Sequence, residues 1–361
     1  MRFARLCAVK RDFRAVSTRS TILYLAFAAI LSSTCYFRPV PDDFDRYIYE
    51  ALVRGRYQSV ETIYPIIKHE NPRAENSSVL DSPTHLRQLE PLYAIRPTYV
   101  DAIAMFSMVG IPIQRSINLV SAVSFFGIAI LLLVLTGRPF YSALLLATPA
   151  VLVIGRLGTP DALSTLLLIT AFWVLTRDRF HAGVALMILS VWVRTDNVLL
   201  VIAVLGWLVW ERKLSALRGS LFALAALGSV LFINRMAGNY GWTVLFRYSF
   251  IGGKYPAEIS THLTTAEYIR AFTTGLQAFV PQLAPWILLG AVAWQWQSRY
   301  RELSPVVAVT ALVHFMLYPS PEGRYLVWAY LITGIAFIDA VNTPVKKIRA
   351  VQETSTTLIN S

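Results

Sequence analysis

The chain has 361 residues, of which 55% are apolar and only 15% charged, and it carries a net charge of +12. Soluble globular proteins contain about a quarter charged residues, so this composition, with a mean hydropathy of +0.52, excludes an ordinary soluble domain and predicts a polytopic membrane protein. In such a protein the positive charge reflects topology and affinity for anionic membrane lipids, and it is no sign of nucleic acid binding.

A helix needs roughly 20 mostly apolar residues to cross the hydrocarbon core of a bilayer. By this measure the sequence predicts about ten spans, at residues 20–37, 117–136, 139–155, 160–176, 180–194, 197–210, 219–236, 273–295, 304–318 and 323–341. The expected fold is an all-α transmembrane bundle, with one domain over 20–341 between tails at 1–19 and 342–361. The two spans that flank Arg194 and Asp196 could instead form a re-entrant pair.

Basic residues predict the orientation, because short cytoplasmic loops are enriched in Lys and Arg. They gather in the N-terminal tail, in four short turns and in the C-terminal tail: Arg2 to Arg19, Arg138, Arg177 with Arg179, Arg212 to Arg218, Arg299 with Arg301, and Lys346 to Arg349. We therefore expect a multi-pass protein of the inner (plasma) membrane with both termini in the cytoplasm.

Two long segments then face the outer side. The first outer loop covers about 38–116 and the second about 234–272. Residues 93–112 are apolar enough to span, but counting them would invert every later loop, and Arg96 and Asp101 argue against contact with lipid. We therefore expect an interfacial or re-entrant amphipathic helix there. A site on the outer face must be built from these loops and the helix ends.

Four polar clusters occupy the predicted outer helix ends. They are Asp42, Asp43 and Asp45 with Tyr47; Gly158 to Asp161; Arg194 to Asn197 with Asp196; and Pro319 to Tyr325 with Glu322 and Arg324. Each has a purely structural alternative: a solvated helix end, a helix start favoured by the dipole, an ion pair across a turn, and a solvated turn. His314, inside an apolar span, is best explained as a hydrogen-bonded helix contact.

No metal or nucleotide site is predicted. Cys7 lies in the basic N-terminal tail and Cys35 at the far end of the first span, and neither has ligand spacing around it. The motifs GxxxxGK[ST], GxGxxG and HExxH are absent. No cofactor is therefore expected.

The joint pattern resembles the GT-C superfamily of integral membrane glycosyltransferases, which use lipid-linked sugars, with a layout similar to protein mannosyltransferases. The stretches that carry this resemblance are PDDFDRYIYEALVRG, RPTYVDAIAMFSMVG, TPDALSTLLLITAFWVLTRDR, VWVRTDNVLL and PEGRYLVWAYLI. They are short, degenerate patterns distributed over most of 20–341.

The resemblance implies an inverting, metal-independent transfer of a sugar from a polyprenyl-phosphate donor to a glycan or lipid-linked acceptor. A base must take the acceptor proton, and the spacing from Asp43 to Tyr47 matches the family's acid with a tyrosine four residues later. Asp43 is therefore the first candidate and Asp42 the second, with Asp45 open. Arg194 and Arg324 are candidates for the phosphate, and Asp161 for orienting the acceptor or an arginine. The other expected substrate-binding residues are Asp45, Tyr47, Arg96, Asp196 and Glu322.

Two other functions remain open. A Wzy-type polysaccharide polymerase or O-antigen ligase also has many spans, a long outer loop and functional arginines. A non-catalytic transporter or flippase of lipid-linked sugars would explain charges along a substrate path. The sugar, the lipid length, the acceptor and the oligomeric state stay open.

Overall fold

In the computed structural model, residues 17–40, 43–71, 80–253, 255–296, 298 and 300–342 are described, and they form helices without a strand. The all-helical prediction is confirmed for this part of the chain. Four of its helical segments are long and apolar enough to cross a membrane: α1 (Thr18–Phe37), α6 (Ile113–Thr136), α12 (Ala216–Ala237) and the segment Gly323–Asn342, which contains η6 (Gly323–Leu326) and α16 (Val327–Asn342).

Two bent helical segments raise the number of candidate spans to six. Helices α7 (Pro139–Leu146) and α8 (Pro149–Arg156) meet at 65°, and α14 (Thr265–Gln295) bends by 62° after Gln282. Proline explains both breaks, since it removes a backbone donor and crowds the preceding turn: Pro149 opens α8, and Pro281 and Pro285 lie within α14.

The remaining apolar helices are shorter than a full span. They are α9 (Asp161–Leu175), α10 (Phe180–Val193), η4 (Thr195–Asn197) with α11 (Val198–Trp210), and α15 (Ser304–Leu317). The 15 residues of α9 reach about 22 Å, against roughly 30 Å of hydrocarbon. Each predicted span thus coincides with a helix or a bent pair, while the number that crosses the membrane stays a prediction.

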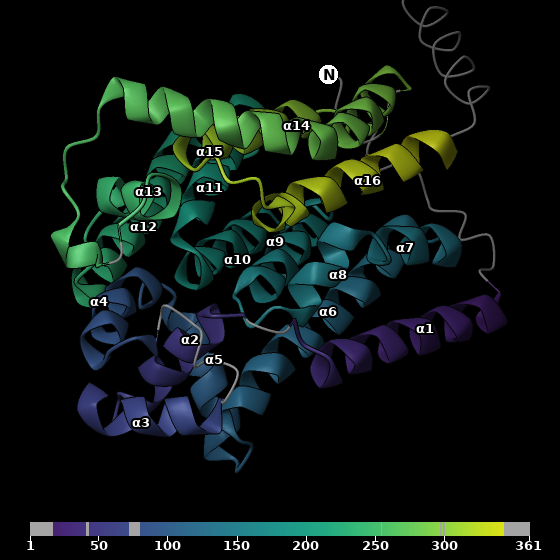
Figure 1. Cartoon of the computed structure of the whole chain (residues 1–361). Helices are drawn as coiled ribbons and strands as arrows, with labels where there is room; N and C mark the ends of the chain where they lie inside the picture. The colour runs from purple at the N-terminus through teal and green to yellow at the C-terminus, as the bar shows by residue number, and fades with distance from the viewer. Residues whose placement is uncertain are drawn as a thin grey trace, which may run out of the picture.

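The apolar helices share one large core, in which α1 lies beside α6 (Figure 1). Two hydroxyl groups of α1 bond to backbone carbonyls of α6. The hydroxyl of Tyr24 donates to the carbonyl of Ala129 at 2.7 Å, and that of Ser32 donates to Ala122 at 2.7 Å. Such bonds satisfy polar groups where no water is available.

The first outer loop folds into four helices that cap one end of the bundle: α2 (Asp45–Arg54), α3 (Val60–Glu70), α4 (Pro83–Tyr93) and α5 (Pro97–Met108), at the lower left of Figure 1. They have a core of their own, which includes the fully buried Tyr49, Ile63 and Leu89. The interfacial helix expected at 93–112 corresponds to α5, which begins only at Pro97, because Tyr93 ends α4. Its place relative to a membrane stays a prediction.

The second outer loop contains α13 (Trp242–Phe250) and η5 (Pro256–Glu258). It touches the first loop, since the N–H of Ala257 donates to Oε1 of Gln88 at 3.2 Å and the Tyr255 ring lies 5.1 Å from that of His85. The two loops, distant in sequence, therefore form one surface.

Candidate functional site

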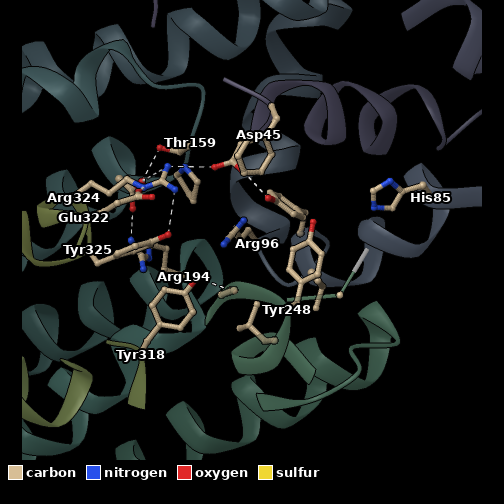
Figure 2. Close-up of a pocket in the computed structure, with 18 residues that line it drawn as sticks. Asp45, His85, Arg96, Thr159, Arg194, Tyr248, Tyr318, Glu322, Arg324 and Tyr325 are labelled. Carbon is tan, nitrogen blue, oxygen red and sulfur yellow. Dashed lines mark hydrogen bonds and ion pairs between the residues drawn. The ribbon is translucent and has the colours of Figure 1, made fainter. Parts of the chain in front are cut away.

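The four polar clusters meet at the capped end of the bundle, around a cavity of about 480 Å³ (Figure 2). Its wall combines the start of α2, the junction of α4 and α5, the turn before α9, the α10–η4 junction, α13 and the segment from Tyr318 to Tyr325. The cavity therefore depends on the tertiary fold, because its wall segments come from six separate parts of the chain.

Asp45 is the acid of the first cluster that lines the cavity. It opens α2, and its carboxylate is shared between two groups: Oδ1 accepts from the Tyr93 hydroxyl at 2.5 Å, and Oδ2 accepts from Nη1 of Arg324 at 3.3 Å. Only 6% of the residue is exposed. Asp45 therefore connects the first outer loop to the turn before α16.

Asp43 is buried beside this wall and is not among the cavity-lining residues. Its Oδ2 accepts from the backbone N–H of Gly158 at 2.6 Å. Burial, followed by the negative charge of Asp45, raises the pKa of Asp43 to about 6, although the Gly158 N–H and the positive charges of Arg324 and Arg46 act in the opposite direction. This acid therefore binds the turn before α9.

Gly158 allows that contact. A Cβ at this position would overlap Cγ of Arg46 and lie 2.9 Å from Cγ2 of Ile117. With no side chain, the backbone can approach α2 and α6 closely, and the following Asp161 is thereby brought to the cavity.

Asp161 is the acid at the start of α9, and it is 3% exposed. Its Oδ2 accepts from the Thr159 hydroxyl at 2.6 Å, and its Oδ1 accepts from Nη1 of Arg194. Nη1 of Arg324 lies 3.9 Å from Oδ2. Asp161 therefore lies between the two arginines, as well as favouring the helix start by its charge.

The Arg194 side chain contacts the Asp196 carboxylate and the Tyr325 ring, in addition to Asp161. Nε and Nη2 donate to the two oxygens of Asp196 at 3.1 and 2.6 Å, and the guanidinium lies 4.9 Å from the centre of the Tyr325 ring. Asp196 in turn has Oδ2 2.7 Å from Nε2 of His314. Although burial by itself raises the pKa of Asp196, Arg194 and His314 hold it below the usual range.

Arg324 is surrounded by acids. Besides Asp45 and Asp161, its Nε is paired with Glu322, and its Nη2 donates to the Tyr325 hydroxyl at 3.1 Å. Figure 2 shows Arg324, Glu322 and Tyr325 as one group on one side of the cavity. The charge of Arg324 is therefore already balanced by protein groups.

Arg96 lies apart from this group (Figure 2). Its Nη1 donates to the Tyr49 hydroxyl, and its guanidinium lies 5.0 Å from the centre of the Tyr93 ring. Among the described residues, no carboxylate lies within ion-pair distance of it. Asp45 and Asp161 act on its charge only from beyond that distance, whereas Arg194 and Arg324 each pair directly with acids.

The predicted site residues divide into three groups. The cavity wall contains Asp45, Arg96, Asp161, Arg194, Glu322 and Arg324. Two acids do not line the cavity: Asp43 binds Gly158, which precedes the lining residue Thr159, and Asp196 binds the lining residue Arg194. Tyr47 is buried in the core of the first loop. Asp42 lies outside the described residues.

Sequence reasoning did not single out the aromatic and histidine part of the wall. His85, Tyr93, Tyr248, Tyr318 and Tyr325 all line the cavity, and no local signal separates them from a band of interfacial aromatic residues. His314, expected to be a hydrogen-bonded helix contact, does form such a bond, and its partner Asp196 belongs to the site.

Within the described ranges, no group of three or more His, Cys, Asp and Glu side chains is arranged to hold a metal ion. Family models, curated proteins and solved structures were compared with this chain, and none matches it. Its function must therefore be argued from the site.

Proposed function

We propose that this protein is a membrane glycosyltransferase that moves a sugar from a polyprenyl-phosphate donor to an acceptor hydroxyl on the outer face of the membrane. The observation that carries the proposal is a cavity at the end of an apolar bundle in which a carboxylate, Asp45, and an arginine without an acidic partner, Arg96, line the same wall. An amphipathic donor could keep its chain in lipid while its head enters such a cavity.

Arg96 is the preferred partner of the donor phosphate. Arg194 and Arg324, the candidates from sequence, are engaged by Asp161, Asp196, Asp45 and Glu322. A phosphate that approached them would have to compete with these carboxylates, whereas at Arg96 it would supply the missing negative charge and up to two charge-assisted hydrogen bonds.

Asp45 is the preferred base, because a general base must come within hydrogen-bond reach of the proton it takes. It lines the cavity, whereas Asp43 is turned to the Gly158 N–H. In the proposed step the acceptor oxygen bonds to the sugar anomeric carbon and its proton passes to Asp45. The bond from that carbon to the phosphate oxygen breaks, with its electron pair leaving on the phosphate, and the configuration inverts.

The test is sugar transfer by purified protein in detergent, from a radiolabelled polyprenyl-phosphate sugar to extracted acceptors. We expect Asp45→Asn to lose roughly 100-fold or more of the rate, as for removal of a general base, and Asp43→Asn to lose less than roughly tenfold. A loss of rate in Asp43→Asn as large as that in Asp45→Asn would contradict the choice of Asp45 over Asp43 as the base.

The same assay separates the other functions. A polymerase or ligase would transfer a preassembled glycan from a lipid carrier and would depend on the arginines more than on Asp45. A transporter would give no transfer at all and would move labelled lipid across the bilayer of reconstituted vesicles. Either result would contradict the proposal.

A further inference from the structure

His314 is a buried histidine that does not line the cavity. It lies on α15, is 7% exposed, and has Nε2 2.7 Å from Oδ2 of Asp196. Since a carboxylate oxygen accepts hydrogen bonds and the imidazole N–H donates them, the ring N–H donates a hydrogen bond to Asp196. The buried imidazole on α15 therefore bonds to η4, which lies between α10 and α11.

Asp196 transmits this contact to the cavity. It is absent from the lining residues, and both its oxygens bind Arg194, which is a lining residue. A long arginine side chain has many rotamers, and fixing one of them costs conformational entropy. The bidentate carboxylate reduces that freedom only if it is itself fixed, and His314 binds Oδ2, the same oxygen that accepts from Nη2 of Arg194.

We propose that His314 is a positioning residue: through Asp196 it fixes the guanidinium of Arg194 against the cavity. Arg194 reaches Asp161, which lies near Arg324, so the contact on α15 determines the arrangement of the polar wall. The consequence for catalysis rests on the proposed function, but the fixation of Arg194 can be measured without it.

The first readout is the rate at which phenylglyoxal modifies Arg194, followed by peptide mass spectrometry. His314→Phe keeps a ring and removes the donor, and we expect it to raise this rate several-fold. His314→Gln places an amide N–H close to the position of Nε2, so it should keep the rate of the unaltered protein.

The matched control is Thr310→Val, one turn earlier on the same helix. Thr310 is equally buried, and its hydroxyl bonds only to the carbonyl of Val306 in α15, so this variant tests for a general loosening of α15. We expect it to leave Arg194 as protected as before. If His314→Phe fails to fold, the smaller His314→Leu makes the same comparison.

The second readout is the kinetics of sugar transfer. His314→Phe should lower kcat/KM by roughly tenfold, as for a lost hydrogen bond to a charged group, and His314→Gln should restore it. Equal Arg194 reactivity in all variants, or a Gln variant that behaves like Phe, would overturn the role of His314. Altered reactivity in a protein without transfer activity would leave that role standing and refute the glycosyltransferase.

Discussion

At the scale of single residues, the cavity is defined by which charges are already paired. Arg194 and Arg324 form ion pairs with acids, whereas the guanidinium of Arg96 bonds to the Tyr49 hydroxyl and lies against the Tyr93 ring, with no carboxylate at ion-pair distance among the described residues. Such a guanidinium beside a cavity is a good anion site, because a ligand can bind it without displacing a carboxylate.

Arg96→Gln should therefore weaken donor binding. We expect KM for the polyprenyl-phosphate sugar to rise roughly tenfold to a hundredfold, in line with the loss of charge-assisted hydrogen bonds. Arg87→Gln is the control, since Arg87 lies in the same loop, pairs with Glu61 and does not line the cavity. Steady-state kinetics of both variants measure the effect; a similar rise in each would show that the loop as a whole had been disturbed.

Asp43 gives a prediction about pH and stability. Its pKa rises from 3.8 to about 6 on folding, so between these values the folded state binds more protons and stability falls as the pH rises. Below about pH 4 both states are protonated and the effect vanishes. The loss is complete above about pH 6.

Asp43→Asn removes this titration while keeping an oxygen for the Gly158 N–H. We expect it to gain stability over the unaltered protein by roughly 1–3 kcal/mol at pH 8 and by little at pH 4.5. Thermal unfolding in detergent at both pH values tests this. An equal change at the two values would mean that Asp43 does not titrate between them.

At the scale of helices, the position of Arg324 depends on how α14 supports the segment before it. The site segment passes so close to α14 that a Cβ at Gly275 would overlap the carbonyl oxygen of Pro319. A backbone atom cannot move aside like the end of a flexible side chain, so the glycine is needed for this approach.

Gly275→Ala should displace the Pro319 segment and destabilise the protein by about 1–3 kcal/mol, the usual cost of overpacking. Gly228→Ala in α12 is the control, because a Cβ there meets nothing within 4 Å and alanine favours a helix. Unfolding temperatures of the two variants give the comparison; a Gly275 variant as stable as the Gly228 variant would show that the segment can shift freely.

For the molecule as a whole, the basic turns predicted to be cytoplasmic and the cavity lie at opposite ends of the bundle. Around the predicted cytoplasmic turns, Nζ of Lys213 lies 4.2 Å from the Trp207 ring centre, and Nη1 of Arg218 lies 3.5 Å from His181. The cavity is at the other ends of the same helices. The orientation of the bundle relative to a membrane stays a prediction from the basic loops.

Cysteine labelling in intact cells tests that orientation. In a background without Cys7 and Cys35, we expect Tyr57→Cys, in the first outer loop, to react with an impermeant maleimide. Thr176→Cys, in the turn after α9, should react only after the membrane is opened. Both positions are exposed, so the reverse pattern would mean that the cavity faces the cytoplasm.

That the chain forms apolar helices, and where they lie, can be predicted from the sequence, because hydrophobic length is a local property that needs no partner. The sequence also predicts Asp161, Arg194 and Arg324 at the same helix ends through the alternation of spans, and the structure places them around one cavity.

Which groups face that cavity follows from helix packing and could not be predicted from the sequence. Asp43 and Asp45 are indistinguishable by composition, yet the docking of Gly158 against α2 turns the first inward and leaves the second on the wall. Helix packing likewise pairs Arg194 and Arg324 with acids and brings His314 to Asp196. It also leaves Arg96 without a carboxylate at ion-pair distance among the described residues. These contacts join residues far apart in the sequence, and their distances depend on how side chains interlock, which no local pattern encodes.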